Sequence, residues 1–77
     1  FDPHVWFDPT LWTFAAARIA EALAEAGVPA AAAALPAWEA ETAALHLYAG
    51  EVLATVPEEA RVLVTAHDAF RYWGRAY

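Results

Sequence analysis

TAHDAF, at residues 65–70, is the stretch around which we expect the chain to be organised. It overlaps an apolar, β-branched run at 61–66, which predicts a strand buried on both faces of a parallel sheet. A helix is expected to follow, from Ala69 to Tyr77. His67 would then lie at the carboxyl end of the strand, where open α/β sheets place their ligand sites. Because one strand cannot form a sheet, its partners are expected outside this chain or in another copy of it.

A first long helix is predicted from Pro9 to about Ala26. Asp8 is a good N-cap and proline is favoured at the first helical position, while Gly27 is a natural terminator. Apolar residues recur at helical spacing and predict the buried stripe of this helix. The members of that stripe are Leu11, Ala15, Ile19, Ala22, Leu23 and Ala26.

A second helical region follows the Val28-Pro29 pair. Residues 30–35 are rich in alanine, and Pro36 is expected to kink or restart the helix. A long helix is then predicted over about 37–56, with a seam suited to packing on other helices. That seam consists of Trp38, Thr42, Leu45, Ala49, Val52 and Val56.

Composition limits the classes of function. The chain has 77 residues, ten acidic residues against four arginines, and a net charge of −6. This charge argues against a nucleic-acid partner and against an anionic membrane surface. No apolar run approaches the roughly 18 residues needed to span a bilayer. The chain contains no methionine and stops inside a predicted helix, so we expect a piece of a longer α/β protein, mostly helical, with one parallel-type strand at 61–66.

Two histidines at opposite ends of the chain are the candidate metal ligands. Neutral imidazole is a good ligand for zinc and other divalent transition metals. His4 lies beside an aromatic segment, and His67 lies in the stretch described above, followed by Asp68, which could cap a helix or support a ligand. From position alone, a capping or core histidine is the favoured interpretation of His67, and a surface residue in a turn is the favoured interpretation of His4. His46 has no histidine or carboxylate four residues away, so we interpret it as a packing residue.

Other chemistries have little support. Asp2 and Asp8 could form an acid–base pair, but each precedes a proline and is better explained by turn and capping chemistry. Serine and cysteine are absent, which excludes serine and cysteine triads within this chain. The three glycines are isolated and form no phosphate-binding loop.

Two motifs carry a family resemblance. DPHVWFDP at 2–9 resembles the D/N-P-H-x-W-L-D-P motif of the zinc- and manganese-binding proteins of bacterial ABC importers, the ZnuA/TroA type. VTAHDAFRY at 64–72 resembles the second block of that family, T-x-H-D-A-F-G-Y-F. The order and separation of the motifs also match, so the resemblance covers essentially the whole chain. Arg71 departs from the usual glycine and Trp73 from the usual phenylalanine.

The resemblance implies an architecture and a site. Residues 1–28 would be the end of a first lobe, 29–57 a connecting backbone helix, and 58–77 the start of a second lobe. His4 would contribute to the metal site from the first lobe and His67 from the second, with further ligands outside this chain. Zn²⁺ would be the favoured transported ligand and Mn²⁺ the alternative, because manganese-preferring members often have glutamate at the position of His67.

The resemblance also implies a role and a location. The protein would bind the divalent metal ion outside the cytoplasm, in the periplasm or on a lipid anchor, and deliver it to an ABC importer permease without catalysis. Two alternatives remain from other classes. One is a zinc-dependent hydrolase in which Asp68 assists as a base at a metal held by His67. The other is a helical structural module whose histidines bind no metal.

Overall fold

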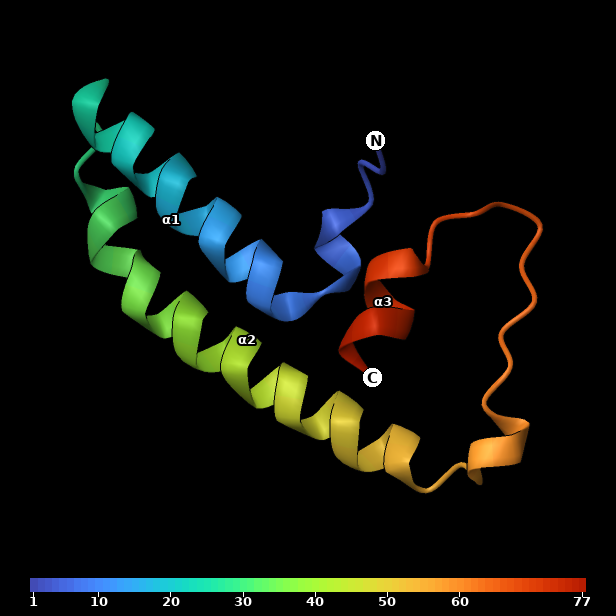
Figure 1. Cartoon of the computed structure of the whole chain (residues 1–77). Helices are drawn as coiled ribbons and strands as arrows, with labels where there is room; N and C mark the ends of the chain where they lie inside the picture. Colours follow the sequence, from blue (N-terminus) through green and yellow to red (C-terminus); the bar gives the residue numbers. More distant parts are fainter.

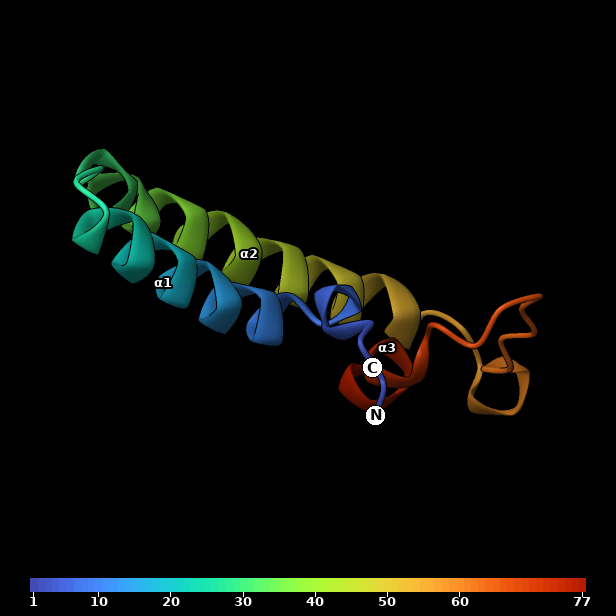
Figure 2. The same cartoon turned by 90° about the horizontal axis from the view of Figure 1, so that it is seen from above.

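The computed structural model describes residues 1–77 as a helical hairpin with two irregular segments at one end (Figure 1). Its elements are the 3-10 helix η1 (Val5–Phe7), α1 (Pro9–Glu25), α2 (Ala30–Ala54), the 3-10 helix η2 (Glu58–Ala60) and α3 (Arg71–Ala76). Helices α1 and α2 run antiparallel, and α3 returns to lie beside the N-terminal segment (Figure 1). Figure 2 shows how thin the molecule is, in agreement with its principal extents of 50 × 27 × 15 Å.

Helix α1 begins and ends as its sequence predicts. The Asp8 carboxylate accepts a hydrogen bond from the Thr10 backbone N–H at 2.9 Å, and Pro9 occupies the first turn. At the other end, Gly27 has φ +89°, in the left-handed region. Glycine adopts this conformation without the steric clash that a side chain would cause. These local signals place a tight connection between α1 and α2.

Helix α2 is continuous across Pro36, so the expected restart of the helix was wrong. The helix runs from Ala30 to Ala54 with Pro36 inside it. Proline has a helical φ, and it removes only one backbone donor. The strong helix formers on both sides, alanine above all, allow the helix to continue despite that loss.

The two long helices meet through small and hydroxyl side chains. The hydroxyl groups of Thr13 and Thr42 lie 2.6 Å apart across the interface, so that one donates to the other and the second donates to a backbone carbonyl of its own helix. Ala20 in α1 and Ala49 in α2 are also buried. The Trp12 and Trp38 rings pack edge to face. The backbones therefore approach closely, with little large apolar surface between them.

The predicted buried stripes were only partly right. In the second helix, Thr42 and Ala49 are buried as expected, but Leu45 is 54% exposed. In the first helix, Ile19 and Leu23 are exposed, and the buried residues are Pro9 and Ala20. Two helices can pack closely only where the facing side chains are small. The large apolar residues next to them on the helix surface therefore point away from the partner helix.

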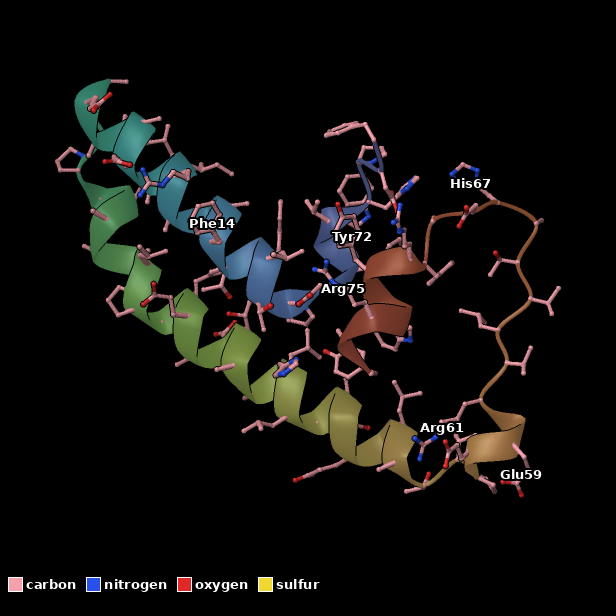
Figure 3. All side chains as sticks on the ribbon, viewed as in Figure 1. Phe14, Glu59, Arg61, His67, Tyr72 and Arg75 are labelled. Atoms are coloured by element: carbon pink, nitrogen blue, oxygen red, sulfur yellow. The ribbon has the colours of Figure 1, made fainter.

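The strand predicted at 61–66 was wrong. These residues are extended but belong to no sheet, and Val62 and Val64 are 77% and 89% exposed. The physical reason is that a strand needs a neighbouring strand for its backbone hydrogen bonds, and the chain forms no other strand. The Arg61 guanidinium fixes the start of this segment by donating to the Val56 carbonyl at 2.8 Å (Figure 3).

The last helix is shorter than predicted. Helix α3 spans Arg71–Ala76 instead of Ala69 to Tyr77, and no side chain caps its N-terminus. Tyr72 of α3 contacts the N-terminal segment, and Tyr77, directly after α3, contacts His46 of α2. No helix of the molecule combines the length and apolar character required to cross a membrane.

Candidate metal centre

The two candidate ligands come together in space. The Nε2 atoms of His4 and His67 lie 3.2 Å apart, although the residues are 63 positions apart in sequence. The two rings are nearly perpendicular, with an interplanar angle of 79°. Figure 3 shows His67 on the loop before α3, on the side that faces the N-terminal segment. The fold therefore juxtaposes the two imidazoles that sequence analysis selected.

The nitrogen separation suits a shared metal ion. Two histidine nitrogens bound to tetrahedral zinc at about 2.0–2.1 Å would lie about 3.3 Å apart. The observed 3.2 Å is close to that value. With no metal between them, the same pair can share a proton in an N–H···N hydrogen bond, so zinc has to displace a proton to bind.

His4 is oriented by Asp2, a contact that sequence analysis missed. One Asp2 carboxylate oxygen accepts hydrogen bonds from the His4 backbone N–H at 3.0 Å and from His4 Nδ1 at 2.7 Å. A neutral His4 therefore carries its proton on Nδ1 and directs the free electron pair of Nε2 at His67. The Trp6 ring packs against the His4 ring edge to face, at 5.5 Å between centroids.

The hydrogen bonds from His4 stabilise the negative charge of Asp2. The hydrogen bond from the His4 backbone N–H has the largest effect and lowers the pKa of Asp2 below 3.8, and the hydrogen bond from the His4 ring and the charge of Arg71 lower it further. The carboxylate is thus ionised at neutral pH. We had interpreted Asp2 as a turn residue alone, and the signal that could have identified its role is its spacing of two residues before His4.

His67 has much weaker support. It is exposed, and its nearest constraint is a hydrogen bond from the Thr65 hydroxyl to the His67 carbonyl at 2.8 Å. Asp68 is exposed, makes no side-chain hydrogen bond and does not cap α3. The structure therefore gives Asp68 neither of the two roles that the sequence suggested.

Contacts between the N-terminal segment and α3 hold the two histidine-bearing segments together. The Tyr72 hydroxyl donates to the Asp2 carbonyl at 3.3 Å. The Phe7 and Phe70 rings stack, with centroids 4.6 Å apart. Asp2 and Phe7 lie on either side of His4 in sequence, and Phe70 and Tyr72 both follow His67, so these contacts hold the two segments next to each other.

His46 and Asp8 lie outside this centre. His46 Nδ1 is 3.1 Å from the Tyr77 hydroxyl, a contact that packs the C-terminal end on α2 and confirms its interpretation as a packing residue. Burial, and then the charge of Asp8, raise the pKa of Tyr77 above 10.0. Asp8 is committed to capping, since it also accepts a hydrogen bond from the Thr10 hydroxyl. It therefore forms no acid–base pair with Asp2.

The donor set of the chain stops at two. No group of three or more histidine, cysteine, aspartate or glutamate side chains is arranged to hold a metal ion. Zinc usually takes four ligands, or three and a water. The two histidines alone are therefore fewer than the ligands that zinc usually takes.

Comparison with known proteins gives consistent results over the whole chain. Residues 1–77 match the family described as zinc-uptake complex component A, periplasmic. The chain is 40% identical to the zinc-binding protein TroA of Treponema pallidum and 41% identical to the manganese-binding lipoprotein MntA of Bacillus subtilis, in each case over the entire chain and 26% of the relative. It is 36% identical to the metal-binding protein YtgA of Chlamydia pneumoniae, over 99% of the chain and 24% of the relative. The chain thus spans about a quarter of the length of the curated relatives it matches, and no solved structure matches it.

Proposed function

The chain belongs to the family of the periplasmic component A of zinc-uptake complexes, and we propose that it binds a divalent transition metal through His4 and His67. The observation that carries this proposal is the 3.2 Å separation of the two Nε2 atoms. Local sequence cannot produce that contact, because the residues lie at opposite ends of the chain. The Asp2 hydrogen bond to His4 adds the orienting carboxylate that metal-bound histidines commonly have.

We propose a place for this metal in transport. The bound ion is cargo that the protein delivers to an ABC importer permease outside the cytoplasm, either free in the periplasm or on a lipid anchor. The name of the manganese-binding lipoprotein supports an anchor, and the description of the family supports a periplasmic location. Residues 1–28 then end a first lobe, 29–57 connect the lobes, and 58–77 begin the second.

Zinc is the favoured cargo on chemical grounds. Both proposed ligands are imidazoles, which suit zinc, whereas manganese prefers carboxylate oxygens. The names of the relatives do not decide between the metals, since one is called zinc-binding and another manganese-binding at nearly equal identity. Manganese remains the alternative cargo.

Catalysis is no part of this proposal. The matching relatives are named for metal binding, and the family for uptake. The hydrolase alternative required Asp68 to act at a metal held by His67, and Asp68 makes no contact that would orient it. A hydrolase would also keep a water on the metal for attack, whereas a carrier protects its cargo.

A calorimetric zinc titration tests the proposal on the 77-residue chain and on three single variants. We expect weak binding by the native chain, because it supplies only two ligands. His4→Ala and His67→Ala should each abolish that binding. His46→Ala is the matched control: it removes the remaining histidine, whose ring contacts Tyr77, and should leave zinc binding unchanged.

Two results would contradict the proposal. Equal zinc binding by the native chain and the His4→Ala variant would remove His4 from the site. Loss of binding in His46→Ala, with helix content by circular dichroism unchanged, would move the site to the middle of α2.

A further inference from the structure

A single hydrogen bond joins the two long helices. The Thr13 and Thr42 hydroxyl oxygens lie 2.6 Å apart, and no other hydrogen bond or ion pair connects α1 with α2. Whichever hydroxyl accepts this bond donates its own proton to a carbonyl of its helix, that of Pro9 or that of Trp38. Both hydroxyl protons are therefore used, and the bond between the helices is one link of a short hydrogen-bonded chain.

The stability of the hairpin does not explain why two hydroxyl groups meet here. Thr42 is one of two buried polar side chains, and the other is the Asp8 cap of α1. A buried hydroxyl pair gains little net free energy, because its hydrogen bond replaces hydrogen bonds to water. Two valines of nearly the same shape would pack at these positions without needing any partner.

The apolar pattern of α2 does not select one face of that helix. Alanine recurs on every side of α2, and the larger apolar residues are spread around its circumference. Leu45 and Leu47, for example, differ in direction by about 200° around the helix axis. A helix without a distinct apolar stripe can pack on its partner in several registers with similar burial.

The hydrogen bond between the helices, in contrast, depends sharply on register. A donor and an acceptor must come within about 3 Å of each other. A slip of one helical turn moves α1 by about 5.4 Å along α2 and breaks the bond. Each hydroxyl would then face apolar side chains across the interface, and the slipped hairpin would gain nothing in exchange.

We propose that Thr13 and Thr42 form a polar pin that fixes the register of α1 on α2. The polar pin favours one register over others of similar apolar burial, as single buried polar residues do in coiled coils. Because residues 1–8 lead directly into α1, the register also determines where that segment lies along α2. Figures 1 and 2 show α1 and α2 side by side along the whole of α1, so that a slip of α1 would shift this segment as well.

The test removes the polar pin without removing volume. Thr13→Val/Thr42→Val replaces both hydroxyls by methyl groups, and the indole N–H signals in an NMR spectrum report the register, since Trp12 packs on Trp38. The chain has four tryptophans, so we expect four indole signals for the native chain and more than four for this variant. The NOE between the Trp12 and Trp38 rings should fall by about twofold or more, because loss of one hydrogen bond removes most of the preference for this register. Helix content by circular dichroism should not change.

Two further variants tie the result to the hydroxyl pair. Thr13→Ser/Thr42→Ser retains both hydroxyls and removes the methyl groups, so it should keep four indole signals even where its melting temperature falls. Thr55→Val is the matched control: it removes a hydroxyl that donates to the Val52 carbonyl at 2.6 Å and has no partner in α1. It should also keep four signals.

Several outcomes would overturn the polar pin. Four signals and an unchanged Trp12–Trp38 NOE in the double valine variant would mean that apolar packing alone sets the register. Extra signals in the double serine variant would assign the register to the threonine methyl groups. Unfolding of the double valine variant would mean that the pair supplies stability and not register, and extra signals in the native chain would mean that no single register exists.

Discussion

The two histidines of the candidate centre are held in very different ways. His4 lies in a segment whose own residues build its surroundings: Asp2 binds its ring, Trp6 packs on it, and its side chain is only 17% exposed. His67 lies in an exposed, extended segment with one local hydrogen bond to its backbone. One ligand is therefore preorganised by neighbours in sequence, and the other depends on contacts made at a distance.

The difference shows what each half of the site requires. The N-terminal segment is followed directly by α1, and the Asp8 cap joins the two without a flexible linker. The segment that carries His67 follows residues with the composition of a sheet strand, and this chain offers them no neighbouring strand. Local hydrogen bonds can fix the first ligand, whereas sheet pairing would be needed to fix the second.

The largest expected effect comes from removing the support of His4. Asp2→Ala deletes the acceptor for His4 Nδ1 and should weaken zinc binding by about 10- to 100-fold, since supporting hydrogen bonds of metal ligands typically contribute that much. Asp2→Asn keeps an acceptor oxygen and should recover most of the affinity. Calorimetric zinc titration of the three chains measures both effects.

Asp8→Ala is the matched control for the Asp2 variants. It removes the other N-terminal carboxylate, which caps α1, and should lower the free energy of unfolding by about 1 kcal/mol without a direct effect on zinc. Equal zinc affinities for the native chain and Asp2→Ala would mean that the orientation of His4 does not matter, and the contrast between the two ligands would lose its basis.

The same contrast explains which parts of the fold could be predicted from sequence. The start of α1 at Pro9 and the turn at Gly27 were predicted correctly, because capping and left-handed backbone depend on a few adjacent residues. The strand at 61–66 was not, because its composition describes a partnered state that this chain cannot form. The buried face of α1 differs from the predicted one because small residues, not large apolar ones, determine the closest approach of two helices.

The candidate site was predicted in part for a similar reason. Histidine chemistry and the two motifs selected His4 and His67, and the structure brings their Nε2 atoms together. The role of Asp2 was missed because an Asp-Pro turn already explains this residue. The same carboxylate also orients the His4 ring through hydrogen bonds.

Acid should loosen the His4 side of the centre selectively. Hydrogen bonds from His4 lower the pKa of Asp2 below 3.8, so the folded state binds this proton less readily than the unfolded chain does. Its stabilising contribution is therefore complete above pH 3.8 and is lost as the pH falls through the lowered pKa. The chemical shift of the His4 backbone amide, followed by NMR, should titrate with a midpoint below 3.8. A midpoint above 3.8 would contradict the hydrogen bonds to Asp2.

The smallest expected effect lies in the exposed segment before His67. Val64 is 89% exposed, so Val64→Thr exchanges one β-branched side chain for another without removing packing, and the free energy of unfolding should change by less than about 0.5 kcal/mol. Thermal unfolding followed by circular dichroism measures the change, and Ala49→Thr, at a buried position of α2, provides a destabilised reference. A loss above about 1 kcal/mol in Val64→Thr would mean that this segment is packed in solution, as a paired strand would be. His67 would then be held as firmly as His4, and the asymmetry between the two ligands would disappear.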